Sequence, residues 1–206
     1  MIGIVDYGMG NLYSISKALE RLGYSYSFVS DAAKLDSFGG LLLPGVGAFG
    51  DAMRNIRELG LDEALRDYAK SGKPMLGICL GMQLLFTQSE EHGQHEGLGL
   101  LSGDVVRFQG DYKIPHMGWN QLTVKQPEHP LMAGLNDGEY VYFVHSFHVR
   151  VNNPQELLAT TDYFQEVTAI VGRDNVYGMQ FHPEKSGETG MRLLDNFAKR
   201  LEGVKS

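Results

Sequence analysis

Residues 74–86, PMLGICLGMQLLF, decide the fold because they place a cysteine at a sharp change of backbone direction. The apolar run before Gly77 predicts a buried strand, and the apolar residues after Gly81 predict the first turns of a helix. Cys79 stands between these two glycines and is the only cysteine of the chain. Glycine permits a tight turn and the close approach of other backbone. A strand, a Gly-x-nucleophile-x-Gly turn and a helix together predict a nucleophile elbow.

The chemistry of Cys79 has two interpretations at this point. At the N-terminus of a helix, the positive end of the helix dipole favours the thiolate, which is the nucleophilic form of cysteine. A lone cysteine can also be a small apolar core residue without reactivity. The flanking glycines favour the nucleophile, and a nucleophile of this kind needs a base.

Composition bounds the class of protein. The chain has 206 residues, of which 43% are hydrophobic and 21% charged, so we expect one soluble domain over residues 1–206. A net charge of −7 argues against a nucleic-acid-binding surface. A single cysteine allows neither an internal disulfide nor a Cys-rich zinc site.

The sequence also gives expectations about compartment and cofactors. No apolar run approaches the roughly 20 residues of a membrane span, so we expect no membrane partner. The first residues indicate a strand rather than a signal peptide, and we expect a cytoplasmic protein. His92 and His95 have no further metal ligands nearby, and we expect neither a metal nor a cofactor.

Apolar runs alternate with helical patterns along most of the chain, which predicts an α/β fold. Strands are expected at residues 2–5, 24–29, 40–43, 74–78, 157–161, 167–171 and 176–181. Helices are expected at residues 12–22, 51–71 with a break at Gly60, and 189–201. The pattern predicts a solvated loop over residues 88–99 and short antiparallel strands over 103–151. We therefore expect a central, mostly parallel sheet flanked by helices, with an additional antiparallel region.

Two glycine-rich loops follow predicted strands. Residues 6–11, DYGMGN, lack the third glycine of a dinucleotide-binding loop, and we interpret them as a turn or a partner contact. Residues 44–50, PGVGAFG, expose backbone N–H groups that could hold an oxyanion at the edge where α/β sheets bind ligands. A tight turn before a helix explains this second loop equally well.

A candidate base, His182, lies near the other end of the chain. Glu184 follows it after one proline, which biases its predecessor toward extended backbone. In an extended segment these two side chains point to the same side. His182 would take the proton of Cys79 and Glu184 would orient the ring, as in a generalised triad. Glu188 and Asp162 are alternative acids, and a surface histidine beside a solvated glutamate is the simpler interpretation.

These motifs together resemble the class I (triad-type) glutamine amidotransferases, which have a flavodoxin-like fold. The similarity rests on GICLGMQ at residues 77–83 and FHPE at 181–184. It extends over the whole chain through DYGMGN at 6–11, PGVGAF at 44–49, MGWN at 117–120, YFVHSF at 142–147 and HPEKSG at 182–187. Within that family the chain is most similar to the glutaminase subunits that work with the cyclase HisF in imidazole glycerol phosphate synthase. No triad position departs from the pattern.

The resemblance implies a mechanism and its residues. Cys79 would attack the side-chain amide of glutamine, His182 would protonate the departing ammonia, and Glu184 would orient His182. Once a peptide near Val46 has reoriented, the oxyanion would be held by backbone N–H groups of Val46, Gly47 and Leu80. The positions matched to glutamine binding are Gly47, Gln83, Ser146 and Phe147.

The resemblance also implies a partner. A glutaminase domain uses about 200 residues, so we expect a separate chain to consume the ammonia. That chain would be HisF, a (β/α)₈ cyclase that forms a heterodimer with this one and makes imidazole glycerol phosphate and AICAR in histidine biosynthesis. The residues expected at the interface or in its signalling are Asn11, Trp119, Tyr142 and Lys185. Core packing explains the two aromatic residues nearly as well.

Three alternatives stay open from the residues alone. The chain could be the glutaminase subunit of another synthase, for anthranilate, aminodeoxychorismate or pyridoxal phosphate. It could be a cysteine peptidase or a γ-glutamyl hydrolase on the same fold, acting without a partner. It could also be a flavodoxin-like binding module in which Cys79 is inert.

Overall fold

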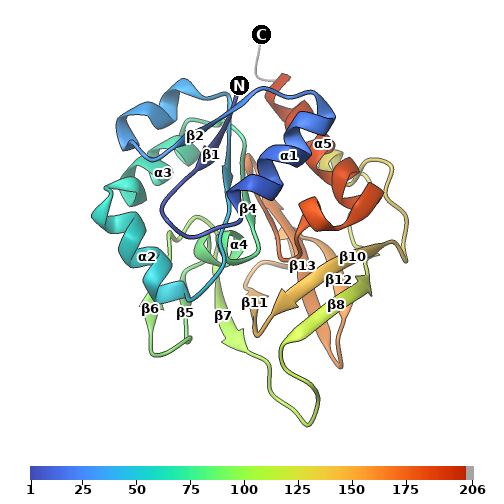
Figure 1. The fold of residues 1–206 in the computed structure, drawn as a ribbon. Coiled ribbons are helices and arrows are strands. Elements are labelled where there is room, and N and C mark those ends of the chain that lie inside the picture. The colour runs from blue at the N-terminus through green and yellow to red at the C-terminus, as the bar shows by residue number, and fades with distance from the viewer. Residues whose placement is uncertain (203–206) are drawn as a thin grey trace.

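The computed structural model describes residues 1–202 as an α/β fold around one large sheet (Figure 1). Among these residues the main sheet has the strand order β2-β1-β3-β4-β14-β13-β12-β9. Its strands, in chain order, are β1 (Ile2–Val5), β2 (Tyr26–Val29), β3 (Gly40–Leu43), β4 (Met75–Ile78), β9 (Thr123–Val124), β12 (Leu157–Asp162), β13 (Glu166–Arg173) and β14 (Val176–Met179). The helices are α1 (Leu12–Leu22), α2 (Phe49–Glu58), α3 (Leu61–Lys70), α4 (Leu80–Leu84) and α5 (Gly187–Glu202).

The sheet has a parallel half and an antiparallel half. Strands β2, β1, β3, β4 and β14 pair in parallel, whereas β14, β13, β12 and β9 pair antiparallel. Because β4 and β14 are parallel neighbours, the segments that follow them leave the sheet side by side. The amide of Cys79 donates to the carbonyl of Met179 at 2.8 Å. This topology brings two segments a hundred residues apart to one edge.

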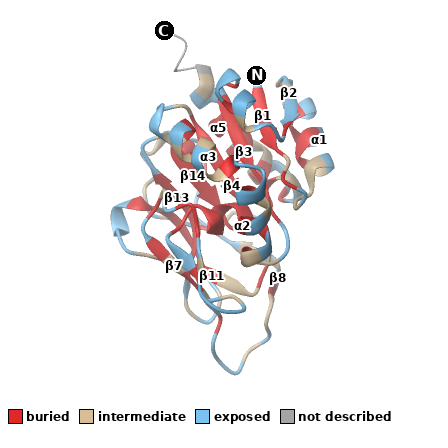
Figure 2. Cartoon of the chain, turned by 90° about the vertical axis from the view of Figure 1, so that its left-hand side faces the viewer, coloured by how far each residue is buried: buried red, intermediate tan, exposed pale blue. Residues whose placement is uncertain are grey.

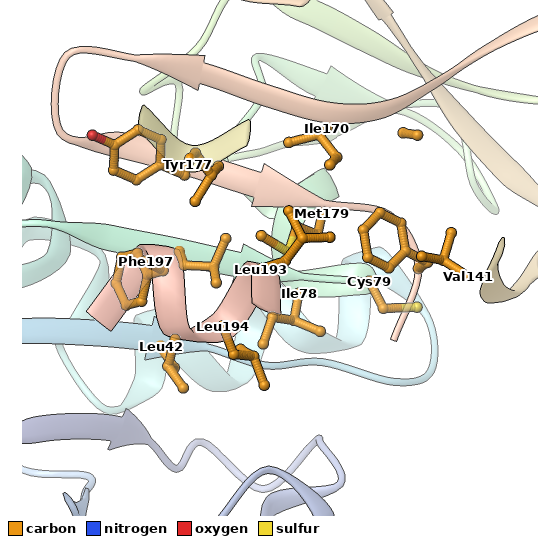
Figure 3. Close-up of a cluster of buried hydrophobic side chains, with 14 of the residues drawn as sticks. Leu42, Ile78, Cys79, Val141, Ile170, Tyr177, Met179, Leu193, Leu194 and Phe197 are labelled. Atoms are coloured by element: carbon orange, nitrogen blue, oxygen red, sulfur yellow. The ribbon is translucent and has the colours of Figure 1, made fainter. Parts of the chain in front are cut away.

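Helices cover both faces of the parallel half because its strands are apolar on both sides. Leu42 and Ile78 point to the face covered by α1 and α5, whereas Leu43 and Met75 point to the face covered by α2 and α3. Figure 3 shows α5 packed against the strands, with the sulfur of Cys79 at one end of this cluster beside Val141. Buried residues gather in the strands of the main sheet and exposed residues on the outer faces of the helices and in loops (Figure 2).

Two smaller sheets complete the fold at the lower end of the molecule in the view of Figure 1. A two-stranded ribbon pairs β8 (His116–Gln121) with β10 (Tyr140–His145). The second sheet has the order β11-β7-β5-β6 and consists of β5 (Gln88–Ser89), β6 (His95–Glu96), β7 (Gly103–Arg107) and β11 (Phe147–Val151). The short 3₁₀ turns are η1 (Ala32–Ser37), η2 (Pro130–Met132), η3 (Pro154–Glu156) and η4 (Pro183–Lys185).

The expected fold is confirmed, with local differences. Gly60, at a φ of 68°, separates α2 from α3 as predicted. The stretch 88–99 was expected to be a solvated loop, but it contains β5 and β6, which are too short to show an alternating pattern. Within 103–151 the pairs β8–β10 and β7–β11 are antiparallel as predicted, and β5, outside that range, adds a parallel pairing with β7. The last strand ends at Met179 rather than at Phe181, and α5 starts at Gly187 rather than near Thr189.

We expect Gly81→Ala to destabilise the protein, because a Cβ at this position would meet the carbonyl oxygen of Leu43. Overpacking of this kind costs about 1–3 kcal/mol. Urea unfolding followed by circular dichroism measures the change. Gly39→Ala is the matched control, since its Cβ would come no closer than 3.7 Å to another atom. Equal unfolding midpoints for the two variants would contradict the packing argument.

Candidate active site

Cys79 occupies the strained turn between β4 and α4. Its φ of 57° and ψ of −116° lie in a sparsely populated region, which costs about 1–3 kcal/mol for a residue with a side chain. Neither flanking glycine has a positive φ. A Cβ on Gly77 would meet the backbone of Gly81, and a Cβ on Gly81 would meet Leu43. The glycines therefore allow close backbone approach, and the sharp turn itself falls on the cysteine.

His182 and Glu184 form a buried pair beside this turn. The ring Nδ1 of His182 lies 2.9 Å from Oε1 of Glu184, and the two side chains are 4% and 1% exposed. The ring and the thiol of Cys79 line the same cavity and interact electrostatically, and the sulfur also lies 4.0 Å from the carbonyl oxygen of Val144. The three residues that the sequence assigned to a triad therefore meet in space.

The backbone that carries this pair differs from the expectation. His182 precedes η4, so Glu184 lies in a 3₁₀ turn and not in an extended segment. Proline is well suited to the first position of such a turn, because its φ is already fixed near the helical value. The prediction of a His182–Glu184 pairing agrees with the geometry, but the reason given for it was wrong. The alternative acids, Glu188 and Asp162, are both exposed.

Hydrogen bonds from β10 and from η4 hold His182 in place. Its amide donates to the carbonyl of Tyr142 at 3.0 Å. The hydroxyl of Ser186 donates to the carbonyl of His182 at 2.6 Å and accepts from the amide of Tyr142 at 2.9 Å. The base is thus fixed to the two-stranded ribbon as well as to the main sheet.

Electrostatics favour a protonated ring at His182. Burial by itself lowers the pKa of His182, but hydrogen bonds to Cys79 and Glu184, with their negative charges, outweigh it and raise the pKa to about 10. The imidazolium is therefore the stable form at neutral pH.

A cavity of about 330 Å³ opens onto Cys79 and His182. Its walls include all the residues predicted to form the oxyanion hole and to bind glutamine, namely Val46, Gly47, Leu80, Gln83, Ser146 and Phe147. It also includes residues that sequence reasoning missed, namely Glu91, Pro115, Val144 and His145. Glu91 lies in the stretch expected to be a solvated loop, where a carboxylate gives no signal. It accepts a hydrogen bond from the amide of Phe49 at 3.1 Å.

One of the predicted oxyanion-binding amides, that of Leu80, is engaged within the protein. The amide of Leu80 donates to the carbonyl of Gly45 at 3.3 Å. The hydroxyl of Tyr7 donates to the carbonyl of Pro44 at 2.6 Å and so anchors the start of the same loop. Val46 is 44% exposed at the cavity wall. The loop therefore caps the very amide that an oxyanion would need.

The residues predicted for a partner interface lie along connected elements. Trp119 on β8 is 55% exposed, so the core-packing interpretation is wrong for it, and its ring contacts the ring of half-buried Tyr142 on β10. Tyr142 is bonded to η4, where Lys185 is exposed, and η4 contacts α1. Asn11 caps α1, its side-chain oxygen accepting from the amide of Ser14. Their role at a partner interface stays a prediction, because no contact with a partner tests it.

Two further features concern a membrane span and a metal site. Between residues 1 and 202, no helix combines the length and the apolar character needed to cross a membrane. The same residues contain no cluster of three or more histidine, cysteine, aspartate or glutamate side chains arranged to hold a metal ion. His95 is hydrogen-bonded through Nε2 to the carbonyl of His92 at 3.2 Å.

Comparisons with known proteins identify the class. The sequence model of the family "Glutamine amidotransferase class-I" matches residues 3–201, and the chain belongs to this family. The solved structures agree on the fold. A glutamine amidotransferase superimposes with a TM-score of 0.78 at 22% identity, over 98% of both chains. PurLQS from Thermotoga maritima does so with a TM-score of 0.76 at 24% identity, over 97% of this chain and 98% of that one.

Curated relatives narrow the identification to one subunit. The chain is 56% identical over 209 residues to imidazole glycerol phosphate synthase subunit HisH of Geobacillus sp. (strain WCH70), covering 98% of each protein. It is 53% identical over 213 residues to the subunit of the same name from Halalkalibacterium halodurans, covering 100% of this chain and 99% of the relative. The predicted family, fold class and enzyme class are thereby confirmed.

We expect Glu184→Gln to lower the pKa of His182, because the substitution removes a negative charge at 2.9 Å from the ring. An NMR titration of the ring should give about 10 in the wild type and a clearly lower value in the variant. A raised histidine pKa stabilises the fold fully below about pH 6.5, and this contribution is lost as the pH rises through 10. The stability difference between wild type and variant should therefore be larger at pH 6 than above pH 10.

Glu188→Gln is the control for this titration, since Glu188 is exposed and follows in the same segment. It should leave the pKa of His182 unchanged. An equal shift in both variants would show that Glu184 has no special influence on the ring.

Proposed function

We propose that the chain is the glutaminase subunit of imidazole glycerol phosphate synthase and releases ammonia from glutamine for histidine biosynthesis. The observation that carries this proposal is that Cys79 and His182 line one cavity together with the loop of Val46 and Gly47, while Glu184 pairs with His182 behind it. The curated relatives named HisH support the choice of synthase, because they match over nearly the whole chain. An inert Cys79 in a binding module would not require a charged base beside it.

The proposed reaction proceeds through a thioester. The Cys79 thiolate attacks the side-chain amide carbon of glutamine, and the carbonyl oxygen becomes an oxyanion. The tetrahedral intermediate collapses when His182 gives its proton to the leaving nitrogen, which departs as ammonia. Water then attacks the thioester with His182 as the base, so glutamate leaves and the thiol is restored. Glu184 keeps the ring oriented and stabilises its positive charge.

Oxyanion binding requires one change in the loop. The amide of Leu80 is bonded to the carbonyl of Gly45, so the peptide between Gly45 and Val46 has to turn before Leu80 can donate to substrate. That turn would also direct the amide of Val46 into the cavity. Gly45 is confined, because a Cβ there would lie 3.0 Å from the amide of Gly81. We infer that the structure represents the resting state of the loop.

The cavity walls suggest how the rest of glutamine is held. Glu91 is the carboxylate of the cavity lining that is not part of the triad, and it suits the α-ammonium group of the substrate. The amide nitrogen of Gln83 is engaged with the carbonyl of Phe147 at 3.2 Å and with Gln180 at 3.1 Å. We therefore assign its amide oxygen to the substrate. Backbone of Gly47, Ser146 and Phe147 completes the site.

We further propose that the chain works in the cytoplasm as a heterodimer with the cyclase HisF, to which it passes ammonia. The exposed side chains of Trp119, Met117 and Tyr140 on the two-stranded ribbon support this proposal, because large apolar side chains are characteristic of interface cores. The hydrogen bond from the amide of Leu80 to Gly45 has to break before the amide can bind an oxyanion, and the partner could control this step. A glutaminase that acted alone would release ammonia without use.

Glutamate release from glutamine tests the function directly. We expect little activity from the chain alone and a rise of at least tenfold when HisF and its ribonucleotide ligand are added, because the loop must then turn. Cys79→Ala is the blank and should be inactive in every mixture. Full activity without HisF would retain the triad but contradict control by the partner. Inactivity in every mixture, with a thiol that resists a glutamine-like alkylating agent, would contradict the function itself.

Substitution of Glu91 tests the assignment of the α-ammonium site. Glu91→Gln should raise the KM for glutamine about tenfold or more with a smaller effect on kcat, since a charge-assisted hydrogen bond is worth about 1.5–3 kcal/mol. Glu90→Gln is the matched control, because Glu90 is exposed and bonds the amide of Arg107 through an oxygen that glutamine keeps. An unchanged KM in Glu91→Gln would contradict the assignment.

A further inference from the structure

A row of hydrogen-bonded side chains runs behind the cavity wall, outside the triad. The ring of His145 at the end of β10 bonds through Nδ1 to the carbonyl of Phe147 at 2.8 Å. Its Nε2 lies 2.9 Å from Nδ1 of His116 on β8. The Nε2 of His116 in turn lies 3.2 Å from the side-chain nitrogen of Asn120. His145 also lines the cavity, whereas Asn120 is half-buried near the surface.

The inner end of this row determines the direction of its hydrogen bonds. The carbonyl of Phe147 can only accept, so Nδ1 of His145 must carry a proton. In a neutral ring the other nitrogen then accepts, so His116 donates from Nδ1 to His145. His116 is left with a bare Nε2, which accepts from the amide of Asn120.

The contacts of Asn120, at the outer end of the row, independently indicate the same direction for these hydrogen bonds. The side-chain oxygen of Asn120 accepts from the amide of Gln121 at 2.8 Å. Its side-chain nitrogen donates to the carbonyl of Asp162 at 2.8 Å. The amide orientation of Asn120 is therefore settled before His116 is considered, and it presents a donor to the ring. The contacts of His145 at the inner end and of Asn120 at the outer end therefore require the same tautomer for each histidine.

Burial keeps both rings neutral, as this arrangement requires. It lowers the pKa of His145 to about 3 and that of His116 to about 4. The ring of His116 is stacked between Tyr163, at 4.0 Å, and Phe143, at 4.6 Å between ring centres. Neutral rings held by stacking have little freedom to rotate. The row therefore fixes the positions of its side chains and carries no charge.

The inner end of the row reaches the substrate site. The carbonyl of Phe147 accepts from His145 and also from Gln83, four residues after the nucleophile. It therefore joins the β10–β11 wall of the cavity to helix α4. Ser146, which lines the cavity, lies between His145 and Phe147 in the chain. A displaced His145 would move this wall relative to Cys79.

We propose that Asn120, His116 and His145 are positioning residues for glutamine, which hold Ser146, Phe147 and Gln83 in place through one directional row of hydrogen bonds. The inference rests on the proposed function, because it assigns these walls to substrate. The row does not include a triad residue. Changes in the row should therefore affect substrate binding more than bond breaking. Removal of a donor from the row should raise the KM for glutamine and leave kcat nearly unchanged.

The test compares two histidines of equal burial. His116→Phe keeps an aromatic ring between Tyr163 and Phe143 but removes the donor to His145. It should raise the KM for glutamine about three- to tenfold, as expected for the loss of one hydrogen bond, with kcat within twofold. His148→Phe is the control, since His148 is also 3% exposed but lies outside the row, and it should change neither constant. Both variants are assayed in the complex with HisF.

Two further measurements keep the proposal falsifiable. Asn120→Ala removes the first donor from a half-buried position and should raise the KM in the same direction with little risk to folding. Nitrogen NMR of the wild type should show His145 neutral, protonated at Nδ1 and bare at Nε2. This readout needs no activity, so it also stands if the chain does not hydrolyse glutamine.

Three outcomes would overturn the proposal. One is a His145 ring protonated at Nε2, which is incompatible with the direction of the row. Another is an equal change in KM for His116→Phe and His148→Phe. The third is an effect of His116→Phe and Asn120→Ala on kcat alone.

Discussion

The close contact between Gly81 and the carbonyl of Leu43 is the constraint on which the rest of the site depends. It presses the start of α4 against the loop that follows β3. The chain can reach this position from β4 only by a sharp turn, and Cys79 adopts a positive φ of 57° to make it. The same approach places the amide of Leu80 within a hydrogen bond of that loop. One packing contact thus positions both the proposed nucleophile and an amide proposed to bind the oxyanion.

The amide of Leu80 is already hydrogen-bonded in the resting state that we propose. An amide brought this close to a loop carbonyl is satisfied by it, and Leu80 donates to Gly45. A typical intramolecular hydrogen bond contributes only about 0.5–1.5 kcal/mol net, so its exchange for a bond to an oxyanion is within reach of partner binding. The bond from Tyr7 to Pro44 anchors the preceding peptide and confines the movement to the next one. The resting and active states that we propose would then differ by a local rotation rather than by a rearranged fold.

Much of the fold was predictable because the patterns that specify it are local. Gly60 ends a helix, and the Gly-x-Cys-x-Gly turn requires a strand before it and a helix after it. Glu91 was not predictable, because its place at the cavity depends on β5, β6 and β7 pairing, and two-residue strands leave no periodic signal. The tautomers of His116 and His145 likewise depend on contacts that only the folded chain provides, between the two rings, 29 residues apart, and between Asn120 and Asp162, 42 residues apart.

The two faces of the two-stranded ribbon carry different kinds of side chain. On β8, Met117 and Trp119 are 54% and 55% exposed, whereas His116 is 3% exposed. Side chains alternate between the faces of a strand, so one short segment presents apolar groups outward and a hydrogen-bonding ring inward. Its partner strand β10 also receives the amide of His182 through the carbonyl of Tyr142. The ribbon is therefore bonded through β10 to the proposed base, and through His145 to the proposed substrate wall.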